Sequence, residues 1–148
     1  DWAVRWFRKR AANGKETTLA IQGRGAPVSA YADAFDGIEG LRLVRCEGAM
    51  LGAWCGRFYD GVCAADDAGA SDAVPIMHVP QGILDEAAAT AQKKSLGDGA
   101  FMWNRNTSRS DCAPLAACTM AYGAIALGAN NGGQRMRTAY ASRGILTV

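Results

Sequence analysis

The sequence predicts a small, mostly α-helical domain with extended basic termini and one or two short strands. Three observations lead to this fold class. Apolar residues recur at near-helical spacing over 38–59, a helix pattern with matched terminal charges covers 83–96, and 18 uncharged, mainly apolar residues occupy 112–129. Gly and Ala recur throughout while bulky β-branched residues are sparse, so these helices would pack closely and bury little apolar area per residue.

The length of 148 residues suits a single domain, which we divide into a basic N-terminal arm (1–24), a helical core (25–134) and a C-terminal arm (135–148). Residues 1–24 contain six bases and two acids, whereas residues 33–86 contain ten acids and three bases. The net charge of +2 is too small to imply nucleic-acid binding, and the acidic middle would repel a phosphate backbone. Nucleic acid is therefore not an expected partner.

Residues 2–12 predict a short amphipathic helix with one aromatic patch, formed by Trp2, Trp6 and Phe7. The bases around this patch are candidate surface contacts: Arg5, Arg8, Lys9 and Arg10. One interpretation is an interfacial anchor, with the rings at the level of lipid headgroups. The interpretation we favour is an arm docked on the domain or on a partner. A short strand is expected next, over 17–22, before the glycine-rich residues 23–27 interrupt it.

The stretch 38–59 predicts one continuous helix. Gly48, Gly52 and Gly56 recur in it at every fourth position, and each costs about 0.8–1 kcal/mol relative to Ala inside a helix. Close approach of another helix or of a flat ligand would offset that cost, so these glycines are candidate helix-packing residues. The alternative is two shorter pieces that meet near Gly48.

Residues 60–75 are acidic and turn-rich and predict a surface loop. The single histidine, His78, follows in a proline-flanked apolar segment, where a hydrogen-bonded structural role is favoured and a ligand role is the alternative. A helix over 83–96 comes next, with acids in its first turn and Lys93 and Lys94 in its last. Its expected buried face consists of Ile83, Leu84, Ala87, Ala88 and Ala91.

The uncharged segment 112–129 predicts a helix that begins after a possible N-cap at Asp111. Its length of 18 mainly apolar residues falls within the range of a membrane span, roughly 17–25 residues. Ala and Gly dominate it, so a buried helix of a soluble core is favoured and a membrane span is the alternative. The tail 135–148 predicts a last strand or an extended arm.

Catalytic and metal-binding patterns are weak in this chain. One histidine leaves few His-based metal sites or triads, and the five cysteines form no C-x-x-C pair, so no metal site is expected. A nucleophile elbow of the G-x-S-x-G type is absent from the sequence. A Cys–His nucleophile pair would require His78 beside a cysteine, and no motif places them together. We therefore expect a protein that is not an enzyme.

The run Ala49-Met50-Leu51-Gly52, within 42–53, resembles the first membrane helix of chlorophyll-binding light-harvesting proteins. In that family a Glu, a His or Asn, and an Arg precede the run. Here Arg42, Arg45 and Glu47 precede it, so the terminal charges are reversed and Arg45 cannot ligate magnesium. The resemblance implies chlorophyll as a cofactor, Glu47 as its candidate ligand and a chloroplast thylakoid as the location.

These observations predict a non-enzymatic structural subunit of a larger, membrane-associated assembly, which the resemblance would make a photosystem or antenna complex. The expected partners are other subunits, with membrane contact through Trp2, Trp6, Phe7 and 112–129. Glu47 and His78 are the candidate cofactor-binding residues. An organelle membrane is the expected location. The alternatives are a free-standing secreted or periplasmic domain with two disulfides, and a small Cys/His enzyme.

Overall fold

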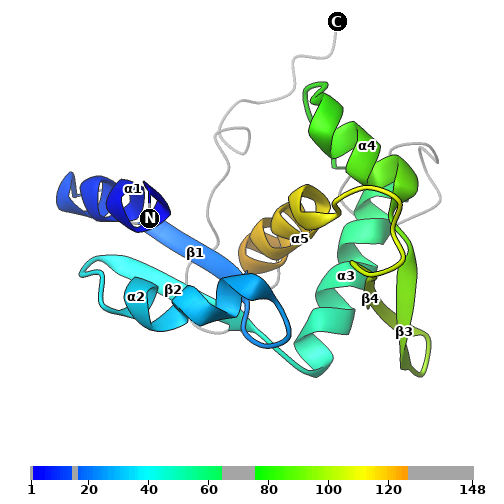
Figure 1. Ribbon diagram of the computed structural model, residues 1–148, viewed down its shortest axis with the longest axis horizontal. Coiled ribbons are helices and arrows are strands. Elements are labelled where there is room, and N and C mark those ends of the chain that lie inside the picture. Colours follow the sequence, from blue (N-terminus) through cyan, green and yellow to red (C-terminus); the bar gives the residue numbers. More distant parts are fainter. Residues whose placement is uncertain (1, 15–16, 65–75, 127–148) are drawn as a thin grey trace, which may run out of the picture.

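The described part of the chain folds into two two-stranded sheets with helices packed around them (Figure 1). The computed structural model describes residues 2–14, 17–64 and 76–126. Within them, 53% helix and 19% strand make the fold a mixture of α and β. The prediction of a mostly helical domain is therefore wrong, because strands form at 41–46, 93–97 and 100–103 in addition to the one expected at 17–22.

In the described residues the elements follow one another in this order: α1 (Trp2–Ala12), β1 (Thr17–Gln22), the 3-10 helix η1 (Pro27–Tyr31), α2 (Ala32–Asp36), β2 (Leu41–Cys46), α3 (Ala49–Cys63), α4 (Gly82–Thr90), β3 (Lys93–Gly97), β4 (Ala100–Trp103) and α5 (Ala113–Ala126). The helix expected over 2–12 and the strand expected over 17–22 are present with those bounds.

β1 and β2 form a two-stranded parallel sheet in which Thr17 pairs with Leu41 and Gln22 with Cys46. η1 and α2 make the crossover between the two strands. One face of the sheet packs against α1 and α2, and Leu19 and Leu43 contribute to that cluster. The other face packs against α3 and α5. Both faces are covered, as the apolar strands of a parallel sheet require.

The predicted helix over 38–59 is instead two elements, β2 and α3. Gly40 and Gly48 have φ of 77° and 55°, values that L side chains rarely adopt, so glycine turns bound the strand at each end. Between them, pairing with β1 outweighs the helical spacing of the apolar residues. α3 then extends to Cys63, into the stretch expected to be a loop, and residues 65–75 lie outside the described part of the chain.

The three candidate packing glycines have three different environments. Gly48 is the N-cap residue of α3 and has the positive φ of the turn before that helix. A Cβ at Gly52 would lie 2.9 Å from the Cβ of Ala100, so Gly52 admits the β3–β4 hairpin of the same chain rather than a neighbouring subunit. Gly56 has open space around it within 4 Å. A tighter approach occurs at Gly123 of α5, where a Cβ would lie 2.1 Å from the indole ring of Trp54.

The helix predicted over 83–96 ends at Thr90, and its last part is strand β3. β3 pairs antiparallel with β4 through a turn in which Gly97, Asp98 and Gly99 all have positive φ. The dipeptide Asp98-Gly99 favours a hairpin turn. It outweighs the helix pattern in which Lys93 and Lys94 would form the last turn, and both lysines lie in β3 instead. The Lys93 ammonium lies 3.3 Å from the centre of the Tyr59 ring, which joins the hairpin to α3.

α5 lies between the β1–β2 sheet and α3 (Figure 1), and it contacts β1, α3 and α4. Its first turn is capped as expected, since the backbone N–H of Ala113 donates to Oδ1 of Asp111 at 2.9 Å. The end of the uncharged segment, 127–129, and the tail 135–148 lie outside the described residues. Among the helices that the structure describes, none is both long enough and apolar enough to cross a bilayer.

A buried hydrogen-bond chain fixes α5 against the hairpin. Nε1 of Trp103 donates to Oγ1 of Thr119 at 2.9 Å, and that hydroxyl donates to the carbonyl of Leu115 at 2.8 Å. Thr119 is fully buried. A buried indole N–H needs an acceptor, so this contact selects the position of β4 along α5.

The glycine environments predict opposite effects of one substitution at two positions. Gly123→Ala should lower the free energy of unfolding by about 1–3 kcal/mol, because the new methyl group overlaps the Trp54 ring. Gly56→Ala should raise it by about 0.8–1 kcal/mol, because the added methyl meets open space and Ala favours helix. Urea unfolding followed by circular dichroism measures both. Equal effects of the two substitutions would contradict this packing.

Thr119→Val should lower the free energy of unfolding by about 1–3 kcal/mol, because the shape is kept while the Trp103 N–H loses its buried acceptor. Thermal or urea unfolding of the variant is the measurement. A change within about 0.5 kcal/mol, the range of ordinary surface substitutions, would show that the hydrogen bond does not hold the hairpin.

Candidate functional site

α1 has an exposed aromatic side. Trp2 and Trp6, one helical turn apart, are 71% and 47% exposed. The opposite side of the helix anchors it, because Val4 is buried and Phe7 meets the ring of Phe35 edge-on at 5.8 Å. Phe7 therefore packs, partly buried, against the core, and the exposed part of the aromatic patch expected from the sequence consists of the two tryptophans.

The four bases of α1 are all exposed: Arg5, Arg8, Lys9 and Arg10. The helix Trp2–Ala12 contains no acidic residue. The guanidinium of Arg10 lies 5.3 Å from the centre of the Trp6 ring, within the range of a cation–π contact. The outer side of α1 thus combines indole rings with a concentrated positive charge.

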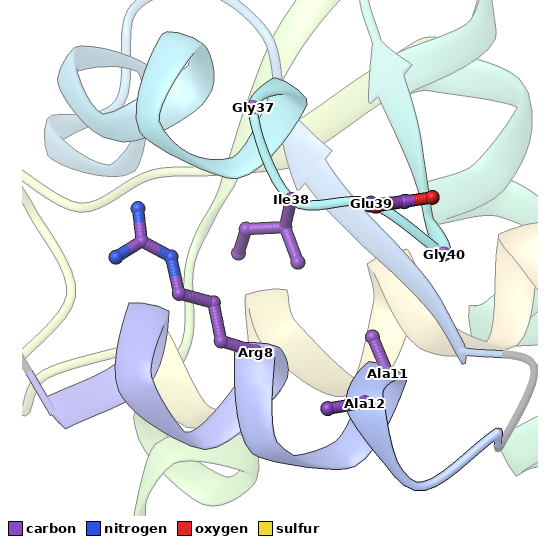
Figure 2. Close-up of a pocket in the computed structure, with 7 residues that line it drawn as sticks. All are labelled: Arg8, Ala11, Ala12, Gly37, Ile38, Glu39 and Gly40. Atoms are coloured by element: carbon purple, nitrogen blue, oxygen red, sulfur yellow. The ribbon is translucent and has the colours of Figure 1, made fainter.

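A shallow depression of about 490 Å³ lies between α1 and the turn 37–40 that follows α2 (Figure 2). Arg8 rises from the helix toward this turn, while the side chain of Glu39 points away (Figure 2). Gly40 permits the close approach, because a Cβ there would lie 3.4 Å from the Cβ of Ala11. The depression is lined mainly by backbone and small side chains, which supplies few groups to orient a small molecule.

A second exposed surface lies before and at the start of α4, and we call it the 77–83 surface. Its apolar residues are Met77, Val79 and Ile83, which are 86%, 70% and 75% exposed. Ile83 was expected on the buried face of this helix, yet Leu84 and Ala87 form that face. The segment stays near the end of α3, since the N–H of Ile76 donates to the carbonyl of Gly61 at 2.9 Å.

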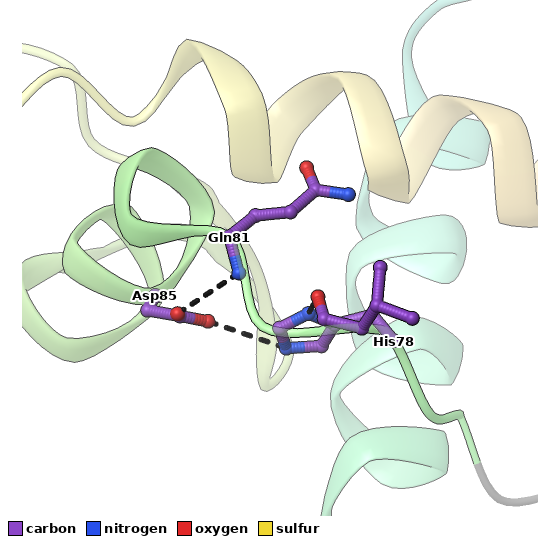
Figure 3. A network of polar contacts seen from close by, with 4 residues as sticks. His78, Gln81 and Asp85 are labelled. Atoms are coloured by element: carbon purple, nitrogen blue, oxygen red, sulfur yellow. Dashed lines mark hydrogen bonds and ion pairs between the residues drawn. The ribbon is translucent and has the colours of Figure 1, made fainter.

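His78 takes part in the polar network that holds this segment (Figure 3). Its Nδ1 lies 2.7 Å from the carbonyl oxygen of Val79, and its Nε2 lies 3.6 Å from Oδ1 of Asp85. The other carboxylate oxygen of Asp85 accepts the backbone N–H of Gln81 at 3.1 Å. The structure therefore places this candidate ligand in contact with an acid and a carbonyl at the N-terminus of α4.

Glu47 lies at the turn between β2 and α3. Its carboxylate is 3.5 Å from Nε of Arg24, and a Cβ on Gly23 would overlap the Glu47 side chain. This candidate pigment ligand is therefore paired with a base from the loop after β1. Glu47 lies just before the first residue of α3, whereas the hydrogen bond between Ile76 and Gly61 holds the segment of His78 near the other end of that helix, so the fold does not bring the two candidates together.

Among the described residues, no group of three or more His, Cys, Asp or Glu side chains is placed to hold a metal ion. All five cysteines lie in the described part, and all are free. The structure thus contains neither of the two disulfides of the exported-domain alternative.

Two buried thiols, those of Cys46 and Cys55, have strongly raised pKa values. Desolvation, with smaller effects of Cys55 and Glu47, raises the pKa of Cys46 to about 12. Burial raises the pKa of Cys55 to about 11, although a backbone hydrogen bond at Trp103 opposes the shift. Burial also raises the pKa of Cys118. A thiol attacks as its thiolate, so these cysteines are poorly suited to nucleophilic catalysis near neutral pH.

Sequence reasoning missed the 77–83 surface as a functional candidate. The signal was present, because three large apolar residues stand close to the two prolines at 75 and 80. Proline removes backbone donors and restricts the residue before it, so a proline-flanked segment rarely enters a packed sheet or helix. Within this segment Met77 and Val79 stay exposed, whereas Ile76 packs against the core.

Comparisons with known proteins find no protein family whose model matches this chain, and no curated protein or solved structure that is similar to it.

The thiol environments predict selective alkylation. In the folded protein, iodoacetamide should modify the exposed Cys63 first, while Cys46 and Cys55 should react only after unfolding. Raising the pH from about 7 to about 9 should not activate the two buried thiols, because their pKa values stay above that range. Peptide mass spectrometry identifies the modified residues. Rapid alkylation of Cys46 or Cys55 in the folded chain would instead favour the Cys/His enzyme.

Proposed function

We propose that this chain is a non-enzymatic interaction subunit of a larger, membrane-associated assembly, and that the 77–83 surface is where another protein subunit docks. The observation that supports this most is the exposure of Met77, Val79 and Ile83, each at least 70% accessible within seven residues of sequence. Scattered exposed apolar residues are ordinary, but a concentrated group is typical of an interface.

The energy available at this surface is adequate for docking. Full burial of a Val, Ile or Met side chain contributes about 1.5–3 kcal/mol, so the three together offer on the order of 5 kcal/mol. Binding also has an entropic cost, which falls when the docking segment is already ordered. The contacts of His78 with Asp85 and with the Val79 carbonyl provide that order.

The surroundings of the surface indicate the chemistry of the partner. Asp85, in the first turn of α4, and Glu86, which follows it, are both exposed and lie close to Ile83 in the sequence. An interface commonly has an apolar centre and a polar rim. The complementary surface should therefore present apolar side chains bordered by Lys or Arg.

The test is sedimentation of the chain in mildly solubilised native cells. The wild-type chain should sediment with a large particle, and the variant Met77→Ser/Val79→Ser/Ile83→Ser should shift to the position of a 15.5 kDa monomer. The matched control is Ile125→Ser, which changes a 58% exposed residue on α5 and should leave the sedimentation unchanged.

Circular dichroism of the purified triple variant should match the wild type, because the three substituted side chains are largely exposed. A folded triple variant that still sediments with the large particle would show that the 77–83 surface is not the docking site. A wild-type chain that sediments as a monomer would contradict the proposed function itself.

A further inference from the structure

We propose that the outer side of α1 binds the anionic headgroups of a lipid bilayer. This inference rests on the membrane-associated part of the proposed function, and it names the element that makes the membrane contact. The two tryptophans and the bases beside them on the exposed side of the helix are the residues that would touch lipid.

The geometry of α1 suits a helix that lies flat on a surface. Val4 and Phe7 fix its inner side to the core, so Trp2 and Trp6 project from a supported helix. α1 lies at the edge of the molecule (Figure 1), where no other described element covers its outer side. Indole rings are favoured at the level of lipid headgroups, since they combine an apolar body with a polar N–H.

Charge complementarity selects an anionic surface. Arg5 and Lys9 lie one turn apart on the same side of the helix as the tryptophans, and Arg8 and Arg10 flank them. Each Lys or Arg near an anionic bilayer strengthens partitioning by about fivefold, and the effect declines as salt is added. Eleven residues form a short helix, so the attachment should be weak and reversible, as expected for a chain also held by a protein partner.

The arrangement around Trp6 favours lipid over single-stranded nucleic acid. Stacking of a base requires a free aromatic face. The Arg10 guanidinium lies over one face of the Trp6 ring, and Phe7 meets that ring edge-on at 4.8 Å, which leaves less of the ring for a base to stack on. A tryptophan in contact with arginine can still enter the headgroup layer, where both groups meet phosphates.

The experiment measures binding of the whole chain to vesicles of phosphatidylcholine, with and without phosphatidylserine. Tryptophan fluorescence reports on α1, because Trp54 and Trp103 are buried whereas Trp2 and Trp6 are exposed. Mixed vesicles should shift the emission to shorter wavelength and reduce acrylamide quenching, and added salt should reverse both effects. Pure phosphatidylcholine vesicles should leave the emission unchanged.

Two variants and one control sharpen the test. Arg5→Gln/Lys9→Gln should weaken partitioning into the mixed vesicles by about 25-fold, at about fivefold for each base. Trp2→Ala/Trp6→Ala should abolish the fluorescence shift and reduce co-sedimentation with the vesicles. Arg57→Gln/Lys94→Gln removes two exposed bases from α3 and β3, and should bind like the wild type.

The outcomes separate this inference from the proposed function. Absence of binding to mixed vesicles, or equal loss in the Arg57/Lys94 control, would overturn it. Tight binding of an oligothymidine strand that quenches Trp2 and Trp6 would overturn it in favour of nucleic acid. If vesicles do not bind while the endogenous chain still sediments with a large particle, the subunit proposal stands and the lipid contact fails.

Discussion

The close contact of the Trp54 ring with Gly123 is the constraint on which the rest of the structure depends. The indole is 3% exposed, and it fills the space where α3, α5 and the β1–β2 sheet meet, together with Cys46 and Met120. Only a residue without a side chain at 123 lets α5 come so near to α3. α5 contacts β1 and α4, and α3 contacts β4 of the hairpin. The contact between α3 and α5 therefore connects the parallel sheet to α4 and the β3–β4 hairpin, which lie on the other side of α5 (Figure 1).

Once α5 is placed, the two candidate surfaces follow from what the core leaves uncovered. α1 covers one face of the sheet with Val4 and Phe7, and so presents its tryptophans and bases outward. α4 packs through Leu84 and Ala87, which leaves Ile83 at the surface beside the His78 network. A chain rich in Gly and Ala buries little area per residue. These uncovered surfaces are the reason why we propose protein docking at the 77–83 surface and lipid contact at α1.

The elements predicted correctly are those whose pattern lies within one short stretch of sequence. α1 and β1 have the bounds that the sequence predicted, and α5 begins at Ala113, one residue after the predicted start, where the Asp111 side chain accepts the Ala113 N–H. The helix expected over 38–59 failed because β2 depends on pairing with a strand 24 residues earlier, which periodicity within one window does not detect. Asp98-Gly99 signalled the hairpin that replaced the end of the expected 83–96 helix. Among the candidate site residues, the sequence correctly predicted that the bases of α1 are exposed. The ion pair between Glu47 and Arg24, and the separation of Glu47 from His78, depend on how distant segments pack, so the sequence alone could not predict them.

Hydroxyl-radical footprinting of the chain, isolated and in its native particle, tests the central claim most directly, because Met and Trp side chains oxidise in proportion to their exposure. In the isolated chain Met77 and Trp2 should oxidise fast, while the buried Trp54 and Trp103 are protected. In the particle we expect strong protection of Met77 by a protein partner and of Trp2 by lipid, with Trp54 unchanged. Equal oxidation of Met77 and Trp2 in both samples would contradict the assignment of these two surfaces to docking.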